Sequence, residues 1–262
     1  MTSLADRTIA ALRSTHDELA VVVRDLSDDQ LSGPSGASAW TVAQVLSHLG
    51  SGAEITLASF RAALDGTPAP GPDFNQSVWD RWNAMSPRHQ AAGFLERDAA
   101  LVERLDALTS DERENVHIEL GFLPAPLPVA SAAGMRLSET AQHSWDIRVA
   151  LDPAATIDAP SAEVLIEHFT GGVGFLLGFI AKAGELSQPA LVQLQGSDVA
   201  IAIEDQVSLT TSAAPATATF RGQPEAAVRL IGGRLTPQYT PAAVQVTGNV
   251  TLDDLRRVFP GF

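Results

Sequence analysis

Three residues of this 262-residue chain, His48, Glu139 and His143, have the side-chain types and spacing of a divalent-metal site. Glu139 and His143 lie four residues apart in a predicted helix, so both side chains fall on one face with Cβ atoms about 5–6 Å apart. His48 lies at the edge of the apolar stripe of another predicted helix, which could face the first. Two imidazoles and one carboxylate suit zinc or a similar ion, and three protein ligands leave one position for water or substrate.

Spacing alone leaves plainer interpretations open. A Glu–His pair at i and i+4 is common on solvated helix surfaces, and a histidine on an apolar stripe can be a core residue with a hydrogen-bonded ring. Asp146 lies one turn after His143 and could orient that imidazole without itself being a ligand. The other histidines are weaker candidates, and His168, in an apolar helix, is expected to be structural: His16, His89, His117 and His168.

The composition excludes several kinds of chemistry. The chain has no cysteine, which excludes disulfides, thiolate ligands and a cysteine nucleophile, so any sulfur chemistry needs a thiol from outside. Its net charge of −14 argues against a nucleic-acid partner. We see no secretion-signal pattern, and the longest apolar run, from Phe169 to Ala181, is shorter than the roughly 20 residues of a membrane span. We therefore expect a cytoplasmic protein with no membrane partner.

Four apolar-periodic segments are predicted to be the helices that position the candidate ligands. They span residues 3–26, 41–64, 87–108 and 131–151. Thr41 is the expected N-cap of the second helix, and the fourth ends before Pro153. Residues 27–39 and 65–73 are predicted loops, and a short segment around Trp79 and Trp82 follows the latter. Helices of this kind favour an antiparallel four-helix bundle.

The pattern changes after residue 153. Residues 161–182 predict one further apolar helix, and alternation after Pro189 predicts short strands. The predicted strands span 191–194, 199–203, 207–209, 216–220 and 243–247, with helices over 223–233 and 251–258. We therefore predict an α+β protein, with a metal-binding helical bundle over residues 1–153 and a smaller C-terminal α/β domain over residues 160–262.

Two sequence motifs resemble the mycothiol-dependent maleylpyruvate isomerase family, whose N-terminal domain is a DinB/YfiT-like metal-binding bundle. Residues 40–49 (WTVAQVLSHL) are similar to the family helix that supplies the first metal ligand, and residues 139–146 (ETAQHSWD) to the helix that supplies the other two. The interval of about 90 residues between the motifs also fits that family. Residues 233–255 resemble its C-terminal α/β domain. The motifs are moderately specific for the superfamily and say little about the substrate.

The resemblance implies a divalent metal, with zinc as the first choice, and mycothiol as the thiol cosubstrate. Metal coordination would deprotonate a thiol whose ordinary pKa is near 8.5. In an isomerase the thiolate adds to a conjugated double bond, the bond rotates and the thiol is eliminated; in an S-transferase the sulfur stays attached. The expected partners are a small thiol and a small organic substrate, and the sequence leaves a monomer or a homodimer open.

Two arginines are candidates for contacting an anionic substrate. Arg234 follows two glycines at a predicted helix end, in the region where the resembling isomerases place an active-site arginine. Its alternative role is to satisfy carbonyls at that helix end. Arg81 lies near Asn75 and Trp82 on the bundle side. A non-catalytic metal- or ligand-binding module of the same fold is the alternative function, and turnover of a thiol and an electrophile would distinguish the two.

Overall fold

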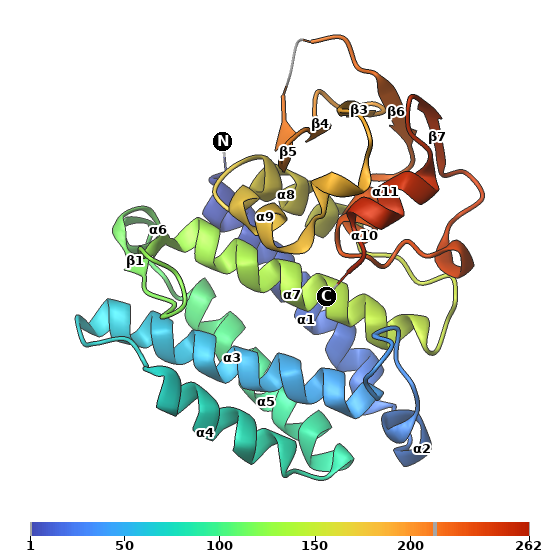
Figure 1. The fold of residues 1–262 in the computed structure, drawn as a ribbon. Coiled ribbons are helices and arrows are strands. Elements are labelled where there is room, and N and C mark those ends of the chain that lie inside the picture. Colours follow the sequence, from blue (N-terminus) through green and yellow to red (C-terminus); the bar gives the residue numbers. More distant parts are fainter. Residues whose placement is uncertain (1, 212–213, 262) are drawn as a thin grey trace. The chain divides into compact units, whose positions relative to one another are not determined.

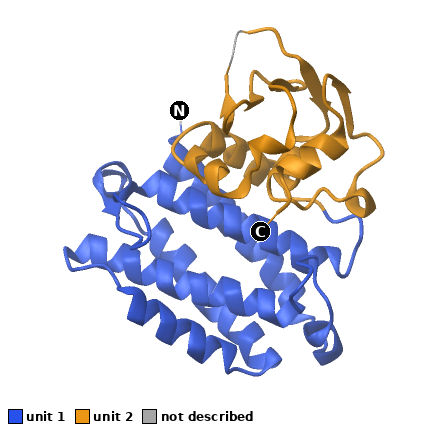
Figure 2. Ribbon diagram, in the orientation of Figure 1, with its two compact units in different colours: residues 1–155 blue, residues 156–262 orange. Residues whose placement is uncertain are grey.

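The computed structural model describes residues 2–211 and 214–261, whose helices and strands are labelled in Figure 1. The chain divides into two compact units, residues 1–155 and residues 156–262 (Figure 2). Unit 1 is almost entirely helical, and unit 2 contains a five-stranded sheet with helices. This confirms the predicted α+β class, with a helical N-terminal part and a smaller C-terminal α/β part.

Unit 1 is built on four long helices. In chain order it contains α1 (Leu4–Arg24), α2 (Asp28–Ser32), α3 (Val42–Asp65), α4 (Pro72–Asn83), α5 (Pro87–Asp106), α6 (Ser110–Asn115), β1 (His117–Ile118), β2 (Leu127–Pro128) and α7 (Val129–Val149). Helix α3 packs against α5 and α7, and α1 packs against the same two helices. Helices α3 and α7 run in opposite directions (Figure 1), so their facing sides can bring distant residues together.

Side chains at helix starts and a shared apolar core hold this bundle in place. Ser3 and Thr41 each form a capping box that satisfies backbone N–H groups at the first turn. Pro87 occupies the first turn of α5, where its missing N–H costs nothing. One buried apolar cluster joins the long helices: Leu19, Val23, Leu26, Leu31, Val42, Ala43, Val45, Leu46, Leu49, Ala91, Phe94 and Ile147.

Two segments predicted as irregular are partly helical. The predicted loop 27–39 contains α2, because Ser27 and Gln30 form a capping box that supports a short helical turn. The short segment around Trp79 and Trp82 belongs to the 12-residue helix α4, which begins at Pro72. Trp82 is buried against α3, so tertiary packing supplies stability that the mixed local pattern did not indicate.

Unit 2 contains a mixed sheet with strand order β5-β4-β3-β6-β7. Its elements are α8 (Ala159–Thr170), η1 (Gly174–Leu176), α9 (Leu177–Ile180), η2 (Ala183–Glu185), β3 (Ala190–Leu194), β4 (Ala200–Ile203), β5 (Val207–Thr210), β6 (Ala218–Arg221), α10 (Pro224–Ile231), η3 (Pro237–Tyr239), β7 (Gln245–Gly248) and α11 (Leu252–Val258). Strands β3 and β6 are parallel, with Val192 opposite Ala218, and the other neighbouring pairs are antiparallel.

The single helix predicted over residues 161–182 is wrong. Helix α8 ends at Thr170, because the backbone N–H groups of Gly171 and Val173 both donate to the carbonyl of His168 and end the helical ladder. At Gly174 a Cβ atom would lie only 2.6 Å from the Phe169 carbonyl, so a glycine is needed for this close approach. Within the described residues, no single helix has both the length and the apolar composition of a membrane span.

Candidate metal centre

His48 is carried by α3, whose register is set by its cap and its core face. Thr41 Oγ1 accepts a hydrogen bond from the Gln44 N–H (3.2 Å), and Gln44 Oε1 accepts one from the Thr41 N–H (2.8 Å). Leu46 and Leu49 are fully buried. His48 lies at the edge of this apolar stripe and is half-buried, so its ring emerges between α3 and α7.

Glu139 and His143 come from α7, a helix that is buried on almost every side. Its polar side chains bond within the helix: Thr140 Oγ1 donates to the Arg136 carbonyl (2.8 Å), and Gln142 Nε2 donates to Ser138 Oγ (3.1 Å). His143 is only 5% exposed. The pair therefore joins a buried imidazole to a partly exposed carboxylate on a helix that is otherwise buried.

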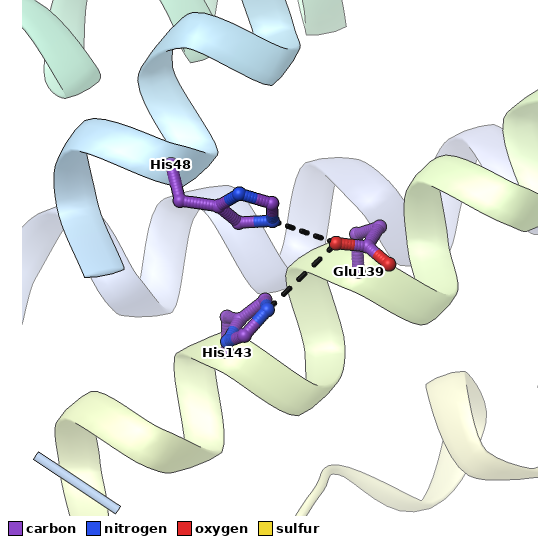
Figure 3. A group of neighbouring side chains, drawn as sticks. All are labelled: His48, Glu139 and His143. Carbon is purple, nitrogen blue, oxygen red and sulfur yellow. Dashed lines mark hydrogen bonds and ion pairs between the residues drawn. The ribbon is translucent and has the colours of Figure 1, made fainter. Parts of the chain in front are cut away.

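The three candidate ligands meet at the Glu139 carboxylate (Figure 3). His48 Nε2 lies 2.8 Å from Glu139 Oε2, and His143 Nε2 lies 3.7 Å from the same oxygen. One ligand atom from each residue lies within 4.8 Å of the other two. The structure thus brings together residues that are 91 positions apart in the chain.

These separations fit a shared divalent ion. Two ligand atoms bound tetrahedrally at about 2.1 Å are about 3.4 Å apart. The two distances to Glu139 Oε2, 2.8 Å and 3.7 Å, lie on either side of this value, so a shared ion requires the side chains to adjust their positions around it. The side chains of His48 and Glu139 are each 38% exposed, which leaves the cluster open to an incoming molecule.

Asp146 orients the buried histidine of the cluster. Its Oδ2 lies 2.8 Å from His143 Nδ1, and the Asp146 side chain is completely buried. A carboxylate at this nitrogen favours the tautomer with the proton on Nδ1, which frees Nε2 as a lone-pair donor. This is the arrangement that a metal-binding imidazole requires.

Trp40 covers the cluster from the loop that precedes α3. Its ring centroid lies 5.1 Å from that of His48 and 5.8 Å from that of His143. The loop is tied to α7 because the Gly36 N–H donates to the Asp146 carbonyl (2.7 Å). A Cβ atom at Gly36 would collide with Val149, so only glycine allows the loop to lie so close. The loop therefore holds an aromatic wall beside the two imidazoles.

A pocket of about 340 Å³ adjoins the cluster between α3 and α4. It is lined by Trp40, Gln44, His48, Ser51, Trp79 and Asn83. Two indole rings, one imidazole, two amides and a hydroxyl form this lining, and none of the six residues is a lysine or an arginine. The pocket is thus suited to a neutral, polar molecule that can also stack against aromatic faces.

The cluster holds its carboxylate in the ionised form. Burial alone would raise the pKa of Glu139, but the His48 hydrogen bond and the charges of His143, His48 and Arg136 outweigh it and lower the pKa to about 2. Glu139 therefore carries a full negative charge at neutral pH, as a metal-binding carboxylate must.

The family described as "Mycothiol maleylpyruvate isomerase N-terminal domain" has a model that matches residues 12–148, more than half of the chain. This chain belongs to that family. The match confirms the resemblance seen in the two motifs, and the matched segment contains His48, Glu139 and His143. Their role as metal ligands stays a prediction, since family membership alone does not test it.

Relatives of this mycothiol maleylpyruvate isomerase family member occur in Mycobacterium tuberculosis. The uncharacterized protein Rv0036c is 26% identical over 199 residues, covering 72% of each chain. The uncharacterized protein Rv0738 is 24% identical over 150 residues, covering 57% of this chain and 70% of the other. A crystal structure of the mycothiol-dependent maleylpyruvate isomerase shares the fold, with a TM-score of 0.66 over 100% of both chains at 14% identity.

The two candidate arginines are engaged elsewhere. Arg81 Nη2 lies 2.5 Å from Glu54 Oε1, and it is not among the residues that line the pocket beside His48. Arg234 belongs to unit 2, is 7% exposed, and donates from Nη1 to the Gly232 carbonyl (2.8 Å). That contact matches the alternative role of satisfying carbonyls at a helix end. A substrate contact for either arginine stays a prediction.

Two features of unit 1 have little signal in the sequence. Trp40 stands out only as part of a motif, although a tryptophan directly before a helix cap is well placed to cover that helix's first turns. His16 has no acidic partner one turn away on its own helix, but its Nδ1 lies 2.8 Å from Asp98 Oδ2 in the core. Asp98 falls on the buried stripe of α5 between Phe94 and Leu101, and a carboxylate in such a position signals a buried ion pair.

Proposed function

We propose that this protein is a metal-dependent enzyme that activates the low-molecular-weight thiol mycothiol for cis–trans isomerisation of maleylpyruvate-like substrates. The cluster of His48, Glu139 and His143, with ligand atoms within 4.8 Å of one another, carries this proposal. Membership of the mycothiol maleylpyruvate isomerase family supports it. A chain without cysteine also has to take its sulfur nucleophile from a cosubstrate.

His48, Glu139 and His143 would hold the metal, with zinc as the first choice because this ligand set is common in catalytic zinc sites. When bound, a divalent cation lowers the pKa of a coordinated thiol so that the thiolate predominates at neutral pH. The protein's own residues prepare this site. Asp146 holds His143 in the ligating tautomer, and the ionised Glu139 balances part of the metal's charge.

The isomerisation is redox-neutral and returns the thiol. The thiolate sulfur forms a bond to one carbon of the substrate's conjugated double bond, whose electron pair moves to the conjugated carbonyl. The former double bond is then single and rotates. The electron pair then returns from the carbonyl and re-forms the carbon–carbon double bond in the other geometry. At the same time the carbon–sulfur bond breaks, and the sulfur leaves with the electron pair of that bond. Trp40 and Trp79 would present aromatic faces to the molecules bound in the adjoining pocket.

Thiol S-transfer is a second candidate, favoured by the charge of the pocket. Maleylpyruvate carries carboxylates, whereas the six pocket-lining residues beside His48 offer no lysine or arginine. A neutral electrophile would fit this lining without a cationic partner. Both reactions use the same metal ligands and the same thiol, and they differ in whether the sulfur leaves the product.

Metal analysis of purified variants tests the site. We expect about one divalent ion per chain in the wild-type protein and nearly complete loss in His48→Ala and His143→Ala, because two remaining ligands bind weakly. His89→Ala is the matched control, since His89 is exposed and its Nδ1 contacts the hydroxyl of the nearby Ser86, far along the chain from the candidate ligands. Full metal occupancy in both ligand variants would rule out the proposed site.

Product analysis distinguishes the candidate functions. The protein is incubated with mycothiol and maleylpyruvate, or with mycothiol and a neutral electrophile. The products are separated by liquid chromatography, which resolves cis from trans isomers, and any thiol adduct is identified by mass spectrometry. An isomer with recovered thiol supports isomerisation, and a stable thioether adduct supports S-transfer. Thiol binding without either product would instead support a non-catalytic binding module. His48→Ala serves as the control for metal-independent background reaction.

A further inference from the structure

A buried ionic network lies in unit 1 outside the ligand set. His16 on α1, Asp98 on α5 and Arg136 on α7 are 7%, 2% and 5% exposed. Asp98 Oδ2 lies 2.8 Å from His16 Nδ1, and Asp98 Oδ1 accepts a hydrogen bond from Arg136 Nη2 (2.7 Å). Burial alone would raise the pKa of Asp98, but the His16 hydrogen bond and the Arg136 charge outweigh it and lower this pKa.

Arg136 connects the two helices that carry the candidate ligands. It lies on α7, one turn before Glu139, and its Nη2 also donates to the carbonyl of Leu49 on α3 (2.8 Å). Leu49 directly follows His48 in the chain. At Gly52 a Cβ atom would lie 2.9 Å from Arg136 Nη1, so the glycine makes room for the guanidinium against α3. One side chain thus spans the gap between the segments that present His48 and Glu139.

Stability alone is a poor explanation for this network. Removing charges from water is costly, and well-packed apolar residues often replace a buried ion pair without loss of stability. Arg136 Nε is also buried without a hydrogen-bond partner among the described residues. What the network provides, and apolar packing does not, is a directional link that fixes one helix against another.

We propose that Arg136, held by Asp98 and His16, is a positioning residue that sets the placement of His48 relative to Glu139 and His143. This inference rests on the proposed metal site. The network determines how far apart the ligand atoms lie and in which directions they point. It therefore determines the affinity and the coordination geometry of the bound ion, while touching neither the ion nor the substrate.

Cobalt(II) is a suitable probe, because its visible d–d absorption reports coordination geometry. The full-length protein is titrated with Co²⁺ as wild type, His48→Ala, Arg136→Lys and the double variant Arg136→Met/Asp98→Asn. The double variant leaves no lone charge in the core, and the amide introduced by Asp98→Asn can still bond to His16. Arg136→Lys keeps the charge but lacks the rigid, planar guanidinium that places Nη2 between Asp98 and the Leu49 carbonyl.

Arg113→Met is the matched control. Arg113 also forms ion-pair and backbone contacts between helical segments of unit 1, to Asp6 on α1 (2.5 Å) and to the Asp106 carbonyl (2.8 Å). Both contacts are remote in sequence from the ligands. Thermal unfolding of every variant is measured alongside the titration, so that a change in the cobalt site can be separated from a loss of stability.

We expect the double variant to bind Co²⁺ about tenfold more weakly than wild type, with an altered d–d band, and Arg136→Lys to fall in between. Arg113→Met should keep the wild-type band even if it unfolds at a lower temperature. A folded double variant with the wild-type band and affinity would overturn the inference, as would an equal change in Arg113→Met. If the wild type shows no His48-dependent Co²⁺ binding, the proposed metal site itself fails.

Discussion

His143 uses both of its ring nitrogens. Nδ1 faces the buried Asp146 carboxylate at 2.8 Å, while Nε2 faces the Glu139 carboxylate at 3.7 Å. The two acidic residues have different surroundings, since the Asp146 side chain is completely buried and that of Glu139 is partly open to solvent. This difference suits the two proposed roles: Glu139 is accessible to a bound ion, and Asp146 is placed to orient the ring.

We expect Asp146→Asn to weaken metal binding about tenfold, within the range of about 10–100-fold seen for residues that orient metal ligands. Asparagine keeps the size of the side chain and one acceptor oxygen, but loses the charge that favours the Nδ1-protonated ring. Competition with a chromophoric chelator measures the affinity. Asp152→Asn is the control, because Asp152 is exposed and its side chain accepts from the Ala154 N–H. Unchanged affinity in Asp146→Asn would remove the orienting role.

The packing of α4 against α3 and α5, beside the pocket, depends on two glycines that leave room for a tryptophan side chain. Trp82 of α4 is 1% exposed, and its Nε1 donates to Glu54 Oε2 (3.1 Å). A Cβ atom at Gly50 of α3 or at Gly93 of α5 would overlap the Trp82 indole. The space left by these two glycines accommodates the Trp82 indole, which holds α4 against the bundle. Helix α4 in turn supplies Trp79 and Asn83 to the pocket.

Gly50→Ala should therefore destabilise the protein, although alanine is the better helix former. The gain in helix propensity is about 1 kcal/mol, whereas overpacking a core typically costs about 1–3 kcal/mol. We expect the collision with Trp82 to dominate and the pocket to widen as α4 shifts. Chemical denaturation checks the stability, with Gly178→Ala as the control because a Cβ there meets no described atom within 4 Å. A Gly50→Ala protein as stable as wild type would contradict this packing argument.

At the scale of the whole molecule, the candidate site belongs to one unit. The three candidate ligands and the side chains that support them all lie within residues 1–155: His48, Glu139, His143, Asp146, Trp40 and the Arg136 network. At the last residue of this unit, the Ala155 carbonyl accepts a hydrogen bond from the indole N–H of Trp145 (2.8 Å). We propose that units 1 and 2 are separate folding domains, and that the metal site requires only the first.

A fragment of residues 1–155 should then unfold cooperatively and bind one divalent ion per chain. The physical reason is that the long helices bury apolar faces against one another, and every member of the core cluster lies between Leu19 and Ile147. Circular dichroism during heating and metal analysis are the measurements. The same fragment carrying His48→Ala controls for adventitious metal. A fragment that is disordered, or that folds without binding metal, would show that unit 2 is required.

Much of this arrangement follows from local sequence. The apolar periodicity of residues 41–64 predicted α3 closely, because one buried stripe at helical spacing has few alternatives. The helix predicted over residues 131–151 also matches α7 within two residues at each end, although α7 is buried on almost every side. The four-residue interval between Glu139 and His143 placed both side chains on one helix face, because residues four apart lie on the same side of a helix. The motifs around His48 and His143 identified the family from residue types alone.

Tertiary structure decided which distant groups meet. His16 and His48 occupy similar places beside apolar stripes, yet one pairs with a buried aspartate and the other with Glu139. Apolar composition likewise failed to reveal the break after Thr170, where convergent backbone hydrogen bonds end the helix. The local pattern determines which residues share one face of a helix. Which residues of two different helices meet depends on side-chain packing and on hydrogen bonds between residues about 90 positions apart in the chain. The sequence therefore indicates which residues are the candidate ligands. Only the folded bundle decides that their ligand atoms lie close together.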